Sequence, residues 1–317
     1  MPVAADSGGQ APGLASGPVP AHRGSFRSWV PGVEQRNLLT SRDHAFVEQH
    51  VWLGTIGLSV TKRPPGITTG TVHGAARMIS FPMGSPRPER INGRRLRDTY
   101  FWIAGEGSDV DIVERDPWFT ANIVFPDDAG ELDQLRPGGE LAVYEVSQPT
   151  LGPLRDLVES VIQTAIRAPH LLADAGVGSA IAENVLVALS RMASGNQSET
   201  VRLSFPMAHR LVRKIDEYVN TVGAGHVRAR KLSREIGRSL RTIHASLVAV
   251  KGVGLSQYLL SSRLWDVRRA LETAPPDTLV KTIALDNGFW HLGRFAQRYR
   301  EQFGETPSET LRNRFGG

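Results

Sequence analysis

The apolar positions of the chain follow a short period first and a helical period later. Between residues 36 and 148 they form brief runs separated by Gly and Pro: HVWLGTIGLSV, TVHGAARMISFPM, DTYFWIAG, DVDIVE, FTANIVFP and ELAVYEVSQ. Short runs with this spacing and turn chemistry are typical of antiparallel strands in a sandwich or barrel. The pattern therefore predicts a β-domain in this part of the chain.

Two amphipathic helices are predicted directly after the β region, at 149–193. In PTLGPLRDLVESVIQTAIR and SAIAENVLVALSRMA the large apolar side chains recur at helical spacing and share one face. Such helices either close the core of the β-domain or form a dimer seam. We expect part of the two stripes to contribute to self-association, through Leu154, Val158, Ile162, Ile181, Val185 and Leu189.

The chain from residue 205 onward is predicted to be helical throughout. A short helix that ends in Gly, a tight turn and a longer helix occur at 229–251 and again at 277–303. One such pair is a weak helix-turn-helix signal. Two pairs joined by a further helix are more specific, because their second helices then fit successive major grooves, about 34 Å apart.

The polar segment SGNQSET at 194–200 contains helix and strand breakers and separates the two regions. The chain therefore divides into a Gly-, Ala-, Pro- and Ser-rich disordered tail at 1–35, a β-rich domain with two helices at 36–198 and a helical domain at 204–317. The expected fold class is α+β with two domains. The first combines antiparallel β structure with two helices, and the second is all-α.

The last long helix, within NGFWHLGRFAQRYREQFGETP, has two distinct faces. Its core-facing stripe consists of Leu292, Phe295, Ala296, Tyr299 and Phe303, and its opposite face of Trp290, Gly293, Arg294, Gln297, Arg298 and Glu301. Gly288 suits the positive φ of the preceding turn, and Gly304 suits the end of this helix. Thr306 is the expected N-cap of a further short helix that begins at Pro307.

Composition narrows the class of protein. The 317 residues include no cysteine, which excludes disulfides, Cys-ligated metals and thiol chemistry. No apolar run reaches the length of about 18 residues that a membrane span needs, and the N-terminus lacks the pattern of a secretory signal. We expect a cytoplasmic protein. Its net charge of +5 divides into +9 for residues 199–317 and −4 for the remainder, so the C-terminal part is the one expected to bind a polyanion.

The C-terminal region resembles the DNA-binding domain of the AraC/XylS family of bacterial transcription regulators. The resemblance covers about 100 residues and rests on Gly252, Tyr258, the segment 263–271, Ile283–Ala284, Gly288–Phe289, Phe295, Phe303–Gly304 and Pro307. The order and composition of the N-terminal region are compatible with that family's usual cupin-like β-domain followed by two helices. Two departures are the weakly polar outward face at Ala245, Val248 and Ala249, and Ser233–Arg234 where small apolar residues are common.

The resemblance implies a sequence-specific, DNA-binding transcription regulator, and an activator because that role predominates in the family. Its expected partners are promoter DNA, a second copy of the chain, RNA polymerase and a small-molecule effector bound to the N-terminal domain. The alternative is a constitutive or architectural DNA-binding protein whose N-terminal domain serves only for dimerisation.

The expected DNA contacts follow from the outward faces of the two recognition helices. Arginine can contact guanine, and glutamine can contact adenine, through two hydrogen bonds each. The candidate base-contacting residues are Arg241, Thr242, His244, Trp290, Arg294 and Gln297. Arg238, Arg298 and Arg300 lie toward the flanks and are expected to contact phosphates.

Other chemistry finds little support in the sequence. There is no phosphate-binding loop, dinucleotide fingerprint, nucleophile elbow or zinc-protease motif, and His22, His44, His50, His73 and His170 lack the spacing of a metal-binding cupin. We expect neither an enzyme nor a metal or other cofactor.

Two candidate effector features remain in the N-terminal region. The cluster PRPERINGRRLRD carries Arg87, Arg90, Arg94, Arg95 and Arg97 and is either an exposed hairpin or a pocket for an anion such as a nucleotide. Tryptophans at 52, 102 and 118 either line an apolar pocket or fill the core. Trp52, Trp102, Arg90 and Arg94 are the candidate pocket residues.

Overall fold

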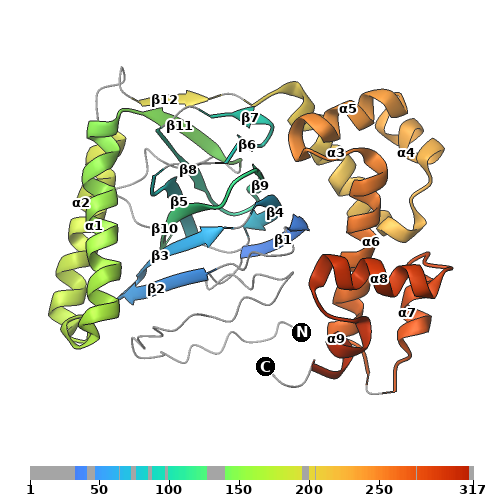
Figure 1. The fold of residues 1–317 in the computed structure, drawn as a ribbon. Coiled ribbons are helices and arrows are strands. Elements are labelled where there is room, and N and C mark those ends of the chain that lie inside the picture. Colours follow the sequence, from blue (N-terminus) through green and yellow to red (C-terminus); the bar gives the residue numbers. More distant parts are fainter. Residues whose placement is uncertain are drawn as a thin grey trace, which may run out of the picture.

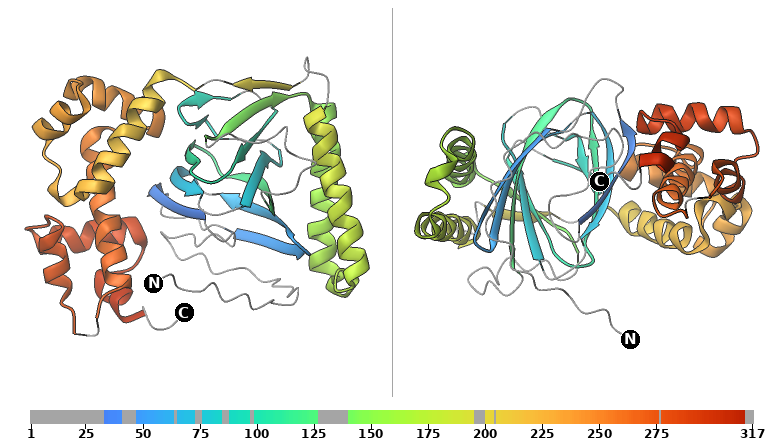
Figure 2. Two further views of the ribbon diagram at one scale, coloured as in Figure 1. Left: turned by 180° about the vertical axis from the view of Figure 1, so that it is seen from behind. Right: turned by 90° about the horizontal axis from the view of Figure 1, so that it is seen from below.

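The computed structural model describes residues 33–40, 47–63, 65–72, 76–84, 88–96, 99–126, 140–194, 200–203, 205–275 and 277–313. Four layers follow one another across the molecule (Figure 1): a pair of helices, a seven-stranded sheet, a five-stranded sheet and a helical domain. The same order is visible from behind and from below (Figure 2). The five-stranded sheet therefore lies between the rest of the β-domain and the helical domain.

Both sheets are antiparallel throughout the described strands, as the short apolar runs predicted. The seven-stranded sheet has the order β12 (Thr200–Leu203), β11 (Ala142–Val146), β8 (Tyr100–Ala104), β5 (Ala76–Pro82), β10 (Trp118–Pro126), β3 (Ile56–Arg63) and β2 (Val47–Leu53). The five-stranded sheet has the order β1 (Val33–Thr40), β4 (Gly66–Val72), β9 (Asp109–Glu114), β6 (Arg90–Ile91) and β7 (Arg94–Arg95). Strand β12 pairs with β11 although it follows the polar segment at 194–200, so the sheet includes residues up to Leu203.

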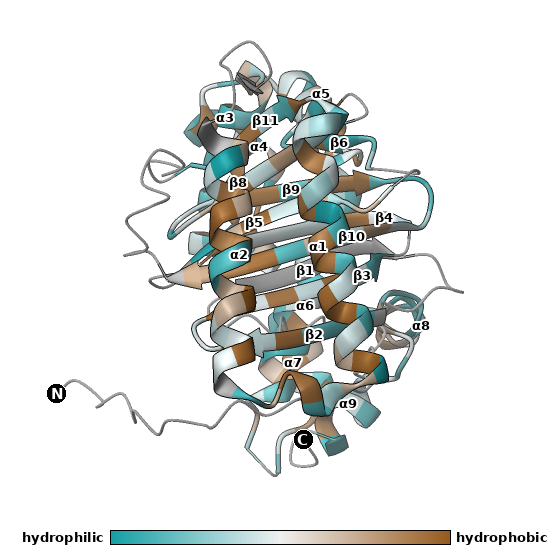
Figure 3. Cartoon of the chain, turned by 90° about the vertical axis from the view of Figure 1, so that its left-hand side faces the viewer, coloured by the Kyte–Doolittle hydropathy of each residue, from teal (hydrophilic) through white to brown (hydrophobic). Residues whose placement is uncertain are grey.

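The two predicted amphipathic helices are α1 (Gln148–Arg167) and α2 (Ala175–Ser194), with the 3-10 turn η2 (Pro169–Leu171) between them. They lie across the outer face of the seven-stranded sheet (Figure 3). Their stripes are buried against its strands, and five of the residues expected at a dimer seam are at most 3% exposed: Leu154, Val158, Ile162, Val185 and Leu189. The expectation that these side chains mediate self-association is therefore wrong, because they close the core of their own domain. The apolar side chains that α1, η2 and α2 do expose are Ile166, Leu171, Val177 and Val187.

The helical domain confirms the two predicted helix-turn-helix motifs. It consists of α3 (Met207–Val222), η3 (Ala224–His226), α4 (Ala229–Ile236), α5 (Leu240–Lys251), α6 (Leu255–Glu272), α7 (Val280–Asp286), α8 (Leu292–Phe303) and α9 (Pro307–Asn313). The first motif is α4–α5, the second is α7–α8, and α6 joins them. Their apolar sides form one core, which also takes in Ile67 and Val113 of the five-stranded sheet.

The turn chemistry around α8 is as predicted. Gly288 and Gly304 have φ angles of +80° and +76°, the left-handed region that favours glycine. Thr306 caps α9 together with Glu309, since the Glu309 amide donates to Thr306 Oγ1 (3.2 Å) and the Thr306 amide donates to Glu309 Oε2 (2.6 Å). The predicted stripe is wrong at one position, because Leu292 is 40% exposed. A side chain in the first turn of a helix lacks a preceding turn to cover it.

Within the described segments, no single helix is both long and apolar enough to cross a membrane. Helices α5 and α6 reach that length and composition only as a pair, which is bent by 66°.

Candidate nucleic-acid interface

The first recognition helix, α5, presents the outward face that the sequence predicted. Ser239 Oγ accepts a hydrogen bond from the Thr242 amide at 3.1 Å, which fixes the start of the helix. The apolar side chains that anchor it to the domain core, Ile243, Leu247 and Val250, are fully buried. The opposite face is exposed and consists of Arg241, Thr242, Ala245, Val248 and Ala249.

His244 lies at the flank of this exposed face and against the start of α6. A Cβ atom added at Gly254 would lie 2.3 Å from His244 Cε1, so the imidazole rests directly on the Gly254 backbone. A larger residue at position 254 would therefore displace the imidazole from this place. Of the three residues predicted to contact bases from the first motif, Arg241 and Thr242 share the central face and His244 does not.

The second recognition helix, α8, is anchored by an aromatic stack. The ring centroids of Phe295 and Tyr299 are 5.8 Å apart, those of Tyr299 and Phe303 are 4.5 Å apart, and all three residues are at most 2% exposed. The predicted DNA-contacting residues of this motif are all exposed: Trp290, Arg294, Gln297, Arg298 and Arg300. In the free protein Gln297 Nε2 donates to Glu301 Oε1 at 3.1 Å, which leaves the second Nε2 hydrogen and the Oε1 atom available for a base.

A buried arginine packs against α8 on its core side. Arg268 of α6 is 5% exposed, lies over the Phe303 ring at 4.9 Å, and pairs with Glu272 (2.8 Å) and Glu305 (3.0 Å). The Tyr299 hydroxyl is 2.9 Å from Thr310 Oγ1 on α9, and burial raises the pKa of Tyr299. These contacts join three helices, so α8 is held by the domain rather than by its own propensity.

The two motifs are also held at a fixed separation by a contact between backbones. A Cβ atom added at Gly225 in η3 would lie 2.8 Å from both the carbonyl carbon and the oxygen of Asn287, in the turn between α7 and α8. A Cβ atom added at the turn residue Gly288 would lie 3.3 Å from the Gly225 oxygen. This contact and the 18-residue α6, about 27 Å long at 1.5 Å per residue, set the position of the second recognition helix relative to the first.

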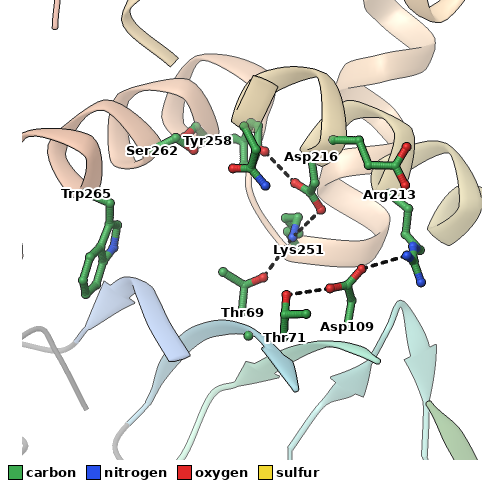
Figure 4. A pocket seen from close by; sticks show the side chains of 12 residues that line it. Thr69, Thr71, Asp109, Arg213, Asp216, Lys251, Tyr258, Ser262 and Trp265 are labelled. Atoms are coloured by element: carbon green, nitrogen blue, oxygen red, sulfur yellow. Dashed lines mark hydrogen bonds and ion pairs between the residues drawn. The ribbon is translucent and has the colours of Figure 1, made fainter. Parts of the chain in front are cut away.

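A buried charge cluster that no local sequence pattern predicted joins the helical domain to the five-stranded sheet. The Nζ atom of Lys251, the last residue of α5, lies 2.5 Å from Asp111 Oδ1. It also lies 3.1 Å from Asp216 Oδ2 and 3.3 Å from Thr69 Oγ1, two contacts drawn in Figure 4. The Lys251 side chain is 1% exposed. Burial opposes its charge, but the two carboxylates outweigh burial and raise the pKa of Lys251. The cluster therefore holds an ionised lysine between the domains.

The same interface contains a second ion pair and a small cavity. Arg213 on α3 pairs with Asp109 on β9 at 3.2 Å, and Thr71 Oγ1 donates to the same carboxylate at 2.7 Å. A cavity of about 190 Å³ lies between these groups and the side chains of α6 (Figure 4). Two strands, β4 and β9, thus contribute every second side chain to the contact with the helical domain, as a pleated strand must.

We expect Asp216→Asn to remove a pH dependence of unfolding. Burial raises the pKa of Asp216 from 3.8 to about 6, although Lys251 acts in the opposite direction, so the folded chain keeps this proton where the unfolded chain releases it. The corresponding stability is fully present below the unfolded pKa and is lost as the pH rises through about 6. The melting temperature of the wild type minus that of the variant should fall between about pH 4 and pH 6. If the difference in melting temperature is constant over that pH range, the pKa of Asp216 is not raised in the folded chain.

Comparison with known proteins identifies the helical domain. Residues 232–313 match a family described as a helix-turn-helix domain. The XylDLEGF operon transcriptional activator 3 of Pseudomonas putida is 32% identical over 130 residues, which are 40% of this chain and 38% of that protein. The XylDLEGF operon transcriptional activator 2 of the same organism is 35% identical over 109 residues, or 33% of this chain and 66% of that protein. The chain belongs to the AraC/XylS family through its C-terminal third.

The chain spans less than two thirds of the length of these relatives, and the match to the helix-turn-helix family covers residues 232–313 alone. A solved structure of a probable AraC family transcriptional regulator from Rhodopseudomonas palustris is 32% identical over 33% of this chain and 97% of that one, with a TM-score of 0.30. AraC/XylS proteins are transcription regulators rather than enzymes, which agrees with the missing catalytic motifs.

The candidate effector residues of this AraC/XylS chain fall into two separate groups. Trp102 is 3% exposed within the core between the two sheets, and Trp52 packs against the same core. Arg90 instead reaches α5, where its guanidinium donates to the carbonyl oxygens of Val248 (3.3 Å) and Ala249 (2.8 Å). Arg94, half-buried, lies on β7. Arg87, Arg97, His22, His44 and His73 lie outside the described residues.

The space between the sheets contains polar side chains as well as these rings. Thr61 donates to Glu48 (2.9 Å), Asn122 donates to Ser59 (3.0 Å), and the hydroxyls of Ser80 and Thr120 are 2.8 Å apart. Arg63 and Trp118 both donate to Glu114, at 2.6 Å and 2.8 Å, and burial raises the pKa of Glu114 despite the arginine. Strands with alternating Ser, Thr and Asn usually turn these residues to solvent, so their position in an interior could not be predicted from the sequence.

Proposed function

We propose that this chain is a sequence-specific transcriptional activator of bacterial promoters, in which residues 204–317 bind DNA and residues 36–198 control that binding in response to a small-molecule effector. The observation that carries the proposal is the pair of recognition helices, α5 and α8, whose polar faces are exposed while their apolar faces are fixed in one core. Relatives of this region are described as operon activators. The proposal includes a cytoplasmic location, a homodimer and a contact with RNA polymerase.

The proposed division of labour in DNA binding follows from the chemistry of the exposed side chains. Arg294 and Gln297 occupy the central face of α8, and Arg241 occupies the corresponding place on α5, where each can form paired hydrogen bonds to a base edge. Arg298 and Arg300 neutralise phosphates and release counterions, which adds affinity without sequence information. Trp290, 76% exposed before α8, adds a large apolar surface at the groove.

The effector is proposed to bind between the two sheets. Polar groups there are placed among Trp52, Tyr100 and Trp102, and a lining that combines aromatic rings with a few polar side chains suits a small ligand. Thermal shift of the full-length chain with candidate small molecules tests this, since a ligand bound to the folded state raises the melting temperature. If a ligand raises the melting temperature of wild type but not that of a Trp102→Phe variant, the result supports a binding site between the sheets. A constitutive DNA-binding protein, the alternative, would respond to none.

Replacing Gln297 or Arg241 with Ala should relax the sequence preference at one or two base pairs, at a cost of about 1–3 kcal/mol in discrimination for each paired contact. Arg298→Ala should instead weaken binding to all sequences equally and flatten the salt dependence by about one unit. Binding-site selection with the three variants at fixed salt distinguishes these outcomes. Identical preferred sites for wild type, Gln297→Ala and Arg241→Ala would mean that other faces of the helices meet the bases.

A further inference from the structure

Three arginines of the β-domain surround one glutamate on the surface next to the first recognition helix. Glu89 Oε1 lies 2.9 Å from Arg90 and 3.6 Å from Arg95, and its Oε2 lies 2.6 Å from Arg115. The hydrogen bond from Arg115 holds the pKa of Glu89 below its usual range, so the carboxylate stays ionised. One negative charge therefore faces three positive ones. We call these four residues the Glu89 cluster.

Two of the three arginines in the Glu89 cluster are accessible. The side chains of Arg95 and Arg115 are 77% and 74% exposed, whereas Glu89 is 17% exposed beneath them. Arg90 and Arg95 are directly paired across the β6–β7 hairpin, so their side chains share one face of it, and the neighbouring Ile91 faces the protein core. The cluster thus presents guanidinium groups outward and keeps its carboxylate below.

This surface is joined directly to the DNA-facing side of α5. Arg90 donates to the carbonyl oxygens of Val248 and Ala249, which belong to the exposed face of the helix. The hairpin turn also touches α5, because a Cβ atom added at Gly93 would lie 3.0 Å from Val250 Cγ2. Figure 1 shows the hairpin at the edge of the β-domain that meets the helical domain. Arg90 also neutralises the partial negative charge of the helix C-terminus.

The dimensions of DNA place a phosphate backbone at this end of the helix. Helix α5 has 12 residues and is about 18 Å long, whereas the major groove of B-DNA is about 12 Å wide. With its N-terminal residues, such as Arg241, at the base edges, the C-terminal turn extends to the wall of the groove. The Glu89 cluster lies beside that turn.

We propose that the β6–β7 hairpin and Arg115 form a second DNA-binding surface, which contacts the phosphate backbone flanking the site read by α5. This proposal rests on the proposed function, because it requires α5 to enter the major groove. Guanidinium groups bind phosphate oxygens through paired, charge-assisted hydrogen bonds. The β-domain thus contributes affinity without sequence information, and the contact connects any movement of β6 and β7 to the strength of DNA binding.

The test compares full-length wild type with Arg95→Ala/Arg115→Ala. Both replaced side chains are largely exposed, and Arg90 still pairs with Glu89 in the variant. The matched control is Arg167→Ala/Arg191→Ala, which removes two exposed arginines from α1 and α2 on the opposite side of the β-domain. Affinity for the site selected by wild type, and for an unrelated duplex, is measured from low to moderate salt, and melting temperatures establish that each variant is folded.

The expected result is a flattening of the salt dependence by about two units for Arg95→Ala/Arg115→Ala, with equal losses of affinity on both duplexes and no change for the control. Hydroxyl-radical footprinting should show backbone protection beside the first half-site that this variant loses. If wild type selects a site and the variant matches the control in salt dependence and footprint, the second surface is refuted and the proposed function stands. If wild type selects no site, the proposed function itself fails. Should the double variant be unfolded, Arg95→Gln alone gives the same comparison with an expected change of about one unit.

Discussion

Lys251→Met is expected to destabilise the full-length chain by about 3–5 kcal/mol, because it leaves the carboxylates of Asp111 and Asp216 facing each other without their shared cation. The side chains of Lys251 and Asp111 are almost fully enclosed by the two domains. Chemical denaturation of the full chain measures the loss.

Lys214→Met on α3 is the matched control, since Lys214 is exposed and should change stability by less than about 0.5 kcal/mol. A double-mutant cycle with Asp111→Asn separates the ion pair from other effects of the methionine, and we expect a coupling free energy of at least about 1 kcal/mol. If Lys251→Met and Lys214→Met unfold at the same denaturant concentration, the charge cluster does not hold the domains together.

Gly225→Ala is the second substitution expected to have a large effect. The new Cβ would lie 2.8 Å from main-chain atoms of Asn287, which cannot move as the end of a flexible side chain can, so η3 and the α7–α8 turn must separate. Overpacking of this kind costs about 1–3 kcal/mol, and here it also displaces the second recognition helix relative to the first. We expect the affinity for the selected two-part site to fall by about tenfold or more.

The control for Gly225→Ala is Gly152→Ala in α1, where an added Cβ meets nothing within 4 Å. That replacement should leave DNA binding unchanged and stabilise the chain slightly, because alanine loses less backbone entropy than glycine. Non-specific binding of Gly225→Ala should persist, since its exposed arginines remain. Equal affinity of wild type and Gly225→Ala for the two-part site would show that the backbone contact does not set the spacing of the motifs.

The outward faces of α5 and α8 could be predicted because a helix buried on one side has a fixed geometry. Once Phe295, Tyr299 and Phe303 are assigned to the core, the directions of Arg294 and Gln297 follow from 100° per residue. The same rule failed at Leu292, which is 40% exposed. Leu292 begins its helix, where the periodic pattern continues but no neighbouring part of the domain covers the side chain.

The interface between the domains could not be predicted, because it depends on which surfaces meet. Lys251 and Asp216 are 35 positions apart on two helices, and Asp111 is on a strand, so no local pattern connects them. A charged residue at the end of a helix is usually solvated, and only the docked sheet buries Lys251. The placement of β12 after a polar segment was missed for a similar reason, since TVRL becomes a strand by pairing with β11.

The five-stranded sheet is a single layer of strands between the interior of the β-domain and the helical domain. Along β4, Thr69 faces Lys251 while its neighbour Thr68 faces the other way. Along β9, Asp111 faces the same lysine while Ile112 enters the core between the sheets. A molecule bound inside the β-domain would therefore press on residues adjacent in sequence to those that hold α5. A small rotation of either strand would move side chains on both faces of the sheet together. Coupling between a molecule inside the β-domain and α5 would then need neither a hinge nor a chain of intervening side chains.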